Sequence, residues 1–243
     1  MPYRLCYIFH SGFALLFDDM TVVMDYFEDS NGANSGVLHE QILGRGVPVY
    51  VLSTHFHHDH YNSDIFGFDA PQVKYILSKD IYQQRKNTLD MSRDIHFIKK
   101  SEIFDDGHLR VHAFGSTDEG VSFAIFKDNL SFFHAGDLNN WHWMEERPEP
   151  EWRRAENDFI RELGDIRKNY DHFDLVMFPV DPRLGSEYMR GAGQFIDAIS
   201  CKYFCPMHFD LNFDKARAFA QYTGPRNIEL IDIDRRGQMF DLA

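Results

Sequence analysis

Cysteine is scarce in this chain, which has only three among 243 residues: Cys6, Cys201 and Cys205. An odd number of thiols at such spacings excludes the disulfide framework of a small secreted domain, and it provides no site of four thiolate ligands. The sequence therefore predicts a protein of a reducing compartment, the cytoplasm.

Basic residues and long apolar runs are also few. Polar residues interrupt the first ten positions, so no stretch there has the length of a signal peptide or a membrane span, and we expect no membrane partner. The 25 basic side chains are outnumbered by 38 acidic ones, which gives a net charge of -13 that repels a phosphate backbone. Nucleic acid is thus a disfavoured partner, and we expect a small-molecule substrate.

Hydrophobic residues make up 44% of the chain, enough to bury a large core, and we expect one domain covering residues 1–243. Three apolar patterns, at 3–9, 13–17 and 21–25, are separated by turn residues and predict an antiparallel meander. Further strands are predicted at 47–52, 73–77, 109–114, 121–126, 130–133, 175–178, 202–205 and 228–231. Helices are predicted at 37–43, 79–87, 151–169, 187–199 and 214–222, with a surface loop at 145–151. This order predicts an α/β fold of two mixed sheets with helices outside.

A potential metal motif follows the apolar strand at 47–52 and consists of His55, His57, Asp59 and His60. Imidazoles combined with a carboxylate suit zinc, iron or manganese better than calcium or magnesium. Because His55 and His57 are two positions apart, both rings leave an extended backbone on the same side and can reach one ion. Asp59 and His60 can then address a second ion. A histidine-rich loop without function is the alternative, and it is disfavoured because loops after buried strands of α/β sheets carry binding sites.

The spacing His-x-His-x-Asp-His after a strand resembles the signature of the metallo-β-lactamase superfamily, and weaker matches follow in the family's order. These are residues 23–25 (Val-Met-Asp), 134–137 (His-Ala-Gly-Asp) and 206–208 (Pro-Met-His). Residues 178–181 (Phe-Pro-Val-Asp), together with Pro-Met-His, are more similar to the ascorbate-lactonase-like branch than to true β-lactamases.

The resemblance implies a four-layer αββα sandwich and a dinuclear metal site. In such a site Asp25 steadies the metal-binding loop, Asp137 bridges both metals, and His208 supplies the last histidine of the second ion. Taken alone, Asp137 is also compatible with a helix cap or a turn, and His208 with a hydrogen-bonded histidine under a loop.

The chain departs from the family pattern at one position. Members usually provide a third histidine to the first ion from a loop that corresponds here to residues 114–123, and this stretch contains none. Asp118 within the loop, or His142 after Asp137, is a candidate replacement ligand, and a carboxylate there favours manganese, iron or magnesium. The alternatives are a turn residue for Asp118 and aromatic packing for His142.

Two divalent ions roughly 3.5–4 Å apart would ionise a bound water and polarise the substrate, so no serine or cysteine nucleophile is needed. Zinc is the expected ion, with manganese or iron as alternatives. Asp59 is the candidate catalytic residue, orienting the metal-bound hydroxide and carrying a proton to the leaving group. The sequence thus predicts hydrolysis of a lactone, an amide or a phosphodiester.

Two other functions stay open: a metal-binding sensor with an incomplete first site, and a nuclease of the same superfamily. The sequence identifies no substrate-binding residue, although the loop at 31–36, the Trp141–Trp143 turn, Arg183 and Arg190 are candidates to line a cleft. The oligomeric state is also open, with a homo-oligomer as one option.

Overall fold

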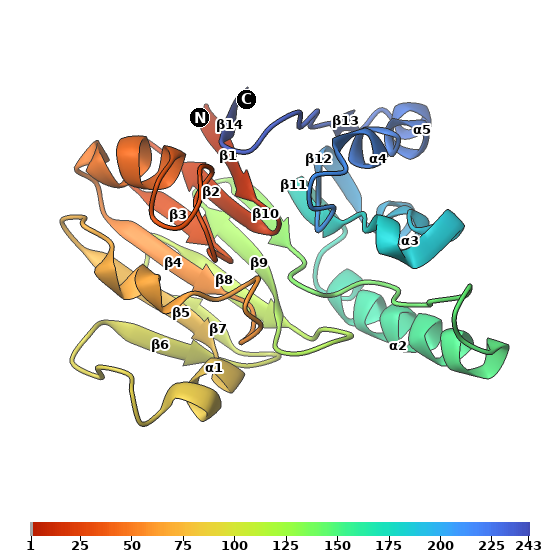
Figure 1. The fold of residues 1–243 in the computed structure, drawn as a ribbon, viewed down its shortest axis with the longest axis horizontal. Coiled ribbons are helices and arrows are strands. Elements are labelled where there is room, and N and C mark those ends of the chain that lie inside the picture. The colour runs from red at the N-terminus through yellow and green to blue at the C-terminus, as the bar shows by residue number, and fades with distance from the viewer. Residues whose placement is uncertain (1) are drawn as a thin grey trace. The chain divides into compact units, whose positions relative to one another are not determined.

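The computed structural model describes residues 2–243, which divide into two compact units. The first consists of residues 2–98 and 233–243, and the second of residues 99–232. Each unit is built around its own seven-stranded sheet (Figure 1).

The sheet of the first unit has the order β14-β1-β2-β3-β4-β5-β6. Its strands are β1 (Tyr3–Phe9), β2 (Gly12–Leu16), β3 (Thr21–Met24), β4 (Val49–Ser53), β5 (Val73–Ser78), β6 (Ile95–Ile98) and β14 (Gln238–Leu242). The predicted meander is confirmed, because β1 pairs antiparallel with β2 and β2 antiparallel with β3. From β3 to β6 the pairing is parallel, so the sheet is mixed.

Helical turns cover one face of this sheet. They are η1 (Leu38–Ile42), η2 (Leu43–Arg45) and the helix α1 (Lys79–Arg85), with η3 (Ser63–Gly67) after the histidine motif. Leu38, Ile42 and Ile81 share a core with Val51 and Tyr75 of the central strands. Every residue of β4 is buried, as expected for a parallel strand in the middle of a sheet.

Strand direction brings three loops of the first unit to one edge. Because β1 and β3 are both antiparallel to β2, they run in the same direction, and β4 runs parallel to β3. The residues that follow these strands, His10, Asp25 and Thr54, therefore all leave the sheet at the edge where β4 delivers the histidine motif.

The second sheet has the order β13-β12-β11-β10-β9-β8-β7 and is also mixed. Its strands are β7 (Ile103–Asp105), β8 (Arg110–Phe114), β9 (Ser122–Lys127), β10 (Leu130–His134), β11 (His172–Pro179), β12 (Ser200–Met207) and β13 (Glu229–Leu230). Strands β10 to β13 are parallel and β7 to β10 antiparallel. The parallel strands β10, β11 and β12 end near Asp137, Asp181 and His208.

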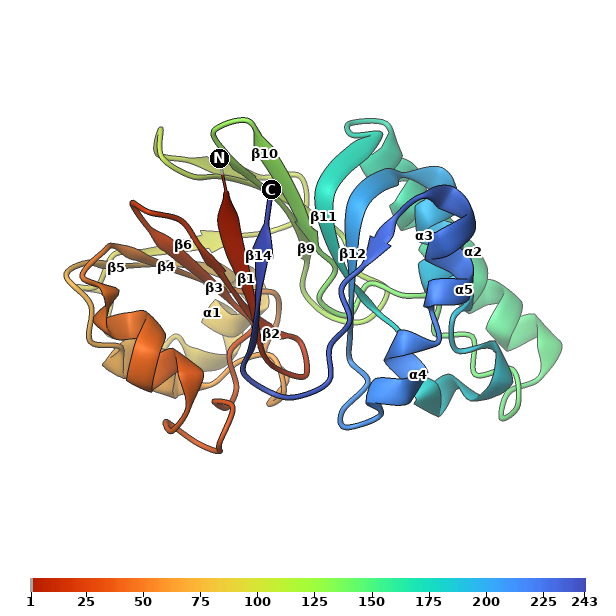
Figure 2. The same cartoon turned by 90° about the horizontal axis from the view of Figure 1, so that it is seen from above.

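The helices of the second unit are α2 (Glu149–Arg167), α3 (Arg190–Ala198), α4 (Phe213–Arg217) and α5 (Ala220–Thr223), with the short turns η4 (Pro182–Glu187) and η5 (Gly224–Arg226). Figure 2 shows α2, α3 and α5 on one side of β11 and β12. Phe195 of α3 packs on Phe133 and Phe178 of the sheet, with ring centroids 5.1 and 4.9 Å apart.

Several helices differ from the sequence prediction. The helix predicted at 214–222 forms two short helices, α4 and α5, and two other helices start at residues that were not predicted. The helix predicted at 151–169 already begins at Glu149, inside the predicted loop at 145–151, because Pro148 is its extended N-cap and Pro150 lies in its first turn, where a missing N–H costs nothing. The helix predicted at 187–199 begins at Arg190, since Gly185 with φ of 80° kinks the preceding turn. Among residues 2–243, no helix combines the length and apolarity needed to cross a membrane.

Candidate metal centre

The first pair of potential ligands lies directly after β4. Nε2 of His55 is 3.0 Å from Nδ1 of His57, and His55 is completely buried. Nδ1 of His55 is 3.0 Å from Oγ1 of Thr54, whose hydroxyl donates to Oδ2 of Asp25 at 2.7 Å. With that hydroxyl proton committed to Asp25, Thr54 accepts the Nδ1–H of His55 and leaves Nε2 as the nitrogen for a cation.

Asp25 connects both halves of the histidine motif. Besides the Thr54 hydroxyl, it accepts the Thr54 N–H at 2.7 Å and lies 2.8 Å from Nδ1 of His60. A carboxylate on one ring nitrogen directs the other nitrogen towards a metal and makes it more basic. Asp25 therefore orients His60 directly and His55 through Thr54, which is the steadying role that the family resemblance implies.

The second group of potential ligands includes a residue that the sequence did not identify. Ligand atoms of His10, Asp59 and His60 lie within 4.8 Å of one another, and Nε2 of His10 is 3.4 Å from Oδ2 of Asp59. Burial favours the neutral form of Asp59, but its hydrogen bond with His10 and the charges of His60 and His10 hold the pKa of Asp59 well below its usual range. Asp59 is thus an anion, as a metal ligand must be.

The second unit brings Asp137 and His208 together at the ends of β10 and β12. Nε2 of His208 is 3.3 Å from Oδ1 of Asp137, and both residues are buried. Nδ1 of His208 lies 3.0 Å from Oδ2 of Asp181, so this histidine also carries a carboxylate on one nitrogen and presents the other.

Arg183 holds Asp181 in place. Its guanidinium donates to both carboxylate oxygens, through Nε at 3.0 and 2.9 Å and through an Nη at 2.5 Å. Burial would raise the pKa of Asp181, but His208 and Arg183 lower it to about 2. Arg183 is therefore bound to an internal carboxylate, although more than half of its side chain is exposed.

Both candidate replacements for the missing third histidine lie in the second unit. Among the described residues, neither Asp118 nor His142 belongs to a cluster of three or more potential ligands. Nδ1 of His142 accepts the N–H of Met144 at 3.2 Å, and its Nε2 lies 3.2 Å from the carbonyl of Glu187. Asp118 donates its N–H to Ser116. Both replacements stay predictions, and the hydrogen bonds of His142 count against it.

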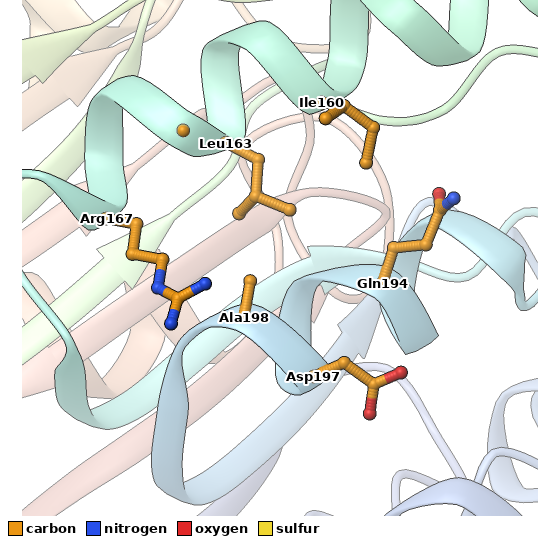
Figure 3. Close-up of a pocket in the computed structure, with 7 residues that line it drawn as sticks. Ile160, Leu163, Arg167, Gln194, Asp197 and Ala198 are labelled. Atoms are coloured by element: carbon orange, nitrogen blue, oxygen red, sulfur yellow. The ribbon is translucent and has the colours of Figure 1, made fainter.

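The other candidates to line a cleft are bound within their own units. Arg190 pairs with Glu156 at 2.8 Å, and the Trp141 indole donates to the carbonyl of Asp137. The loop at 31–36 is fastened by Asp29, which accepts the N–H groups of Ser30, Leu38 and His39. A groove of about 300 Å³ between α2 and α3 contains none of the potential ligands (Figure 3). Its lining is Ile160, Leu163, Gly164, Arg167, Gln194, Asp197 and Ala198.

Neither a protein-family model nor a curated protein matches the sequence. Solved structures do match. Igni18, a metallo hydrolase from Ignicoccus hospitalis, has a TM-score of 0.69 at 16% identity, covering 100% of this chain and 99% of that one. YhfI from Bacillus subtilis, a metallo-β-lactamase fold protein, has a TM-score of 0.66 at 11% identity, covering both chains completely. This chain has the metallo-β-lactamase fold.

The fold alone does not determine the chemistry. CmlA from Streptomyces venezuelae, a diiron β-hydroxylase, has a TM-score of 0.68 at 13% identity, and the match covers 99% of this chain and 54% of CmlA. One fold therefore includes proteins described as hydrolases and one described as a hydroxylase. The function of this chain therefore depends on its own side chains.

Proposed function

We propose that this protein is a metal-dependent hydrolase of a small molecule, with two divalent cations held by His55, His57, Asp59, His60, Asp137 and His208. The observation that carries the proposal is the pair of imidazole nitrogens of His55 and His57, 3.0 Å apart and oriented through the Thr54–Asp25 relay. The lone pairs of two ring nitrogens at this distance repel each other unless a cation or a proton lies between them.

The donor set fits a cation in its chemistry and its spacing. Two bonds of about 2.0–2.1 Å that meet at the tetrahedral angle place their ligand atoms roughly 3.3 Å apart. The His10–Asp59 pair, at 3.4 Å, and the Asp137–His208 pair, at 3.3 Å, match this spacing within their respective units. Three of the histidines carry an oriented partner on Nδ1, as metal-binding histidines do.

The chain's own residues would hold and orient the reacting groups. Bound divalent cations supply Lewis-acid polarisation of the substrate and acidify a water molecule. Asp59 is ionised and a quarter exposed, so it can accept a proton from that water and pass it to the leaving group. Asp25 and Asp181 keep His60 and His208 in the tautomer that presents Nε2.

The donor chemistry indicates which ion is bound, and the sequence motifs indicate which substrate class to test. Nitrogen-rich ligand sets favour zinc, with manganese or iron as alternatives. A lactone is the first substrate class to test, because residues 178–181 and 206–208 resemble the ascorbate-lactonase-like branch, and amides and phosphodiesters follow. All three cysteines carry free, buried thiols, which supports a cytoplasmic location.

Elemental analysis of protein purified without added metal, followed by a hydrolysis screen over these substrate classes, tests the proposal. We expect two ions per chain and turnover that Asp59→Asn lowers by roughly 10²–10⁴-fold. His96→Ala is the control, since His96, in β6 of the same unit, is exposed and belongs to none of the ligand groups among the described residues. Protein without bound metal would refute the proposal, two ions without turnover would favour the sensor function, and cleavage of RNA at physiological salt would favour the nuclease.

A further inference from the structure

We propose that His10 is a metal ligand, and that with Asp59 and His60 it makes the second ion the tightly bound one. This inference rests on the dinuclear site proposed above. Within the first unit, the second ion then has three protein ligands, His10, Asp59 and His60, whereas the first has two, His55 and His57. The chain thus lacks a third histidine at the first ion and has an additional histidine at the second.

The position of His10 is built by several independent contacts. The residue is 5% exposed, and its backbone N–H donates to the hydroxyl of the buried Tyr7 at 3.0 Å. The ring meets those of His60 and Phe27 edge to face, with centroids 5.9 and 6.0 Å apart. Packing and the hydrogen bond together fix the imidazole with Nε2 towards Oδ2 of Asp59, at the spacing of two ligands on one tetrahedral ion.

The backbone of His10 also has an unfavourable conformation. Its φ of 56° is in the left-handed region, which residues with a Cβ adopt rarely and at an energetic cost. A glycine at position 10 would adopt this φ without strain, yet the chain has a histidine there. Retaining a strained histidine there is typical of a residue that serves a site.

A difference in ligand number gives the two ions different roles. Three ligands of the first unit hold the second ion, one short of the four of a closed tetrahedral zinc site, whereas two ligands of that unit hold the first ion. The first ion, with His55 and His57 from this unit, keeps more open positions than the second. It is therefore the ion at which a substrate oxygen would bind, and it is the one that a chelator should remove first.

Cobalt titration of metal-stripped protein tests the role of His10 without measuring activity. We expect two ions per chain with distinct affinities. Loss of an outer hydrogen-bonding partner of a ligand lowers metal affinity roughly 10–100-fold. Because His10 is proposed to be a ligand itself, His10→Ala should lower the affinity for the tighter ion by more than that. The visible spectrum of that ion should change at the same time. His39→Gln is the matched control, because His39 pairs with Asp29 at 2.8 Å in the same unit but outside the cluster.

His10→Cys provides a direct test that does not depend on the stability of the alanine variant. A thiolate at this position should bind cobalt and produce a sulfur-to-cobalt charge-transfer band, which the wild-type protein should lack. Folded His10→Cys protein without this band, or His10→Ala protein with unchanged tight binding, would overturn the ligand role while leaving the dinuclear site intact. A wild-type protein that binds no cobalt would instead refute the proposed function.

Discussion

Oδ2 of Asp25 lies 2.8 Å from Nδ1 of His60, and both side chains are completely buried. The carboxylate also accepts two hydrogen bonds from Thr54. This single acid therefore sets the orientation of two histidines that belong to different ligand groups.

The first prediction concerns this acid. Asp25→Asn keeps the size of the side chain but removes the charge and one acceptor, so the affinity for metal should fall roughly 10–100-fold. Isothermal titration with zinc measures the change. Asp29→Asn, at another buried acid of the first unit that pairs with a histidine, should leave the affinity unchanged. Equal losses in both variants would mean that general destabilisation causes the effect.

The second prediction concerns stability at acid pH. Burial would raise the pKa of Asp29, but hydrogen bonds from His39, Leu38 and Ser30 outweigh it and lower the pKa. The stabilisation is therefore fully present above the unfolded-state pKa of about 3.9 and is lost as the pH falls through the lower folded value.

Asp29→Asn should cost about 1–3 kcal/mol near neutral pH, and the difference from wild type should shrink as the pH falls below 4. Urea unfolding between pH 3 and pH 7, in the presence of a chelator, measures both quantities. A difference that is constant with pH would show that the contribution of Asp29 does not depend on its charge.

The third prediction tests whether the chain folds as one domain. All three tryptophans, Trp141, Trp143 and Trp152, lie in the second unit, so their fluorescence reports on residues 99–232 alone. Phe13→Ala, at a completely buried position of β2 in the first unit, should cost about 3–5 kcal/mol. One cooperative domain requires the fluorescence transition in urea to shift as far as the circular dichroism transition. A fluorescence transition that does not move would establish two independent domains.

The fourth prediction concerns the thiols. Burial raises the pKa of Cys6 and of Cys201 to about 12, and burial also raises the pKa of Cys205. Since the thiolate is the reactive form, a colorimetric thiol reagent at pH 8 should label none of them in the folded protein and all three in denaturant. Fast labelling of one thiol without denaturant would identify a local opening of the structure around it.

The sequence predicted strands well where burial is continuous. Strand β4, with five buried residues, and the meander of β1 to β3 have the apolar patterns that such burial requires. Strands β6, β7 and β14 were not predicted, because they are short and mostly half-buried or exposed, so their sequences carry little apolar periodicity. Pairing with a neighbouring strand, rather than local preference, determines these three.

The candidate site was predictable only in part. His55, His57, Asp59 and His60 are close in sequence, and local spacing is enough to identify them. His10 is 49 residues from Asp59, and the sequence around it indicates only a turn between two strands. The predicted meander nevertheless indicates where His10 lies. The first and third strands of a meander run in the same direction, so the residues that follow them lie at the same edge of the sheet. The bond between Asp181 and His208 depends on the register of β11 and β12, which the sequence does not reveal.

Strand β14 pairs with β1 along five residues, from Tyr3 with Leu242 to Tyr7 with Gln238, and lies beside it in Figure 1. During synthesis the ribosome must deliver the 230 residues between these two paired segments before this ladder can close. Until then β1, whose turn carries His10, has an unpaired edge. The nascent chain therefore has to protect this edge from intermolecular pairing, and assembly of the first unit is completed only after the second has left the exit tunnel.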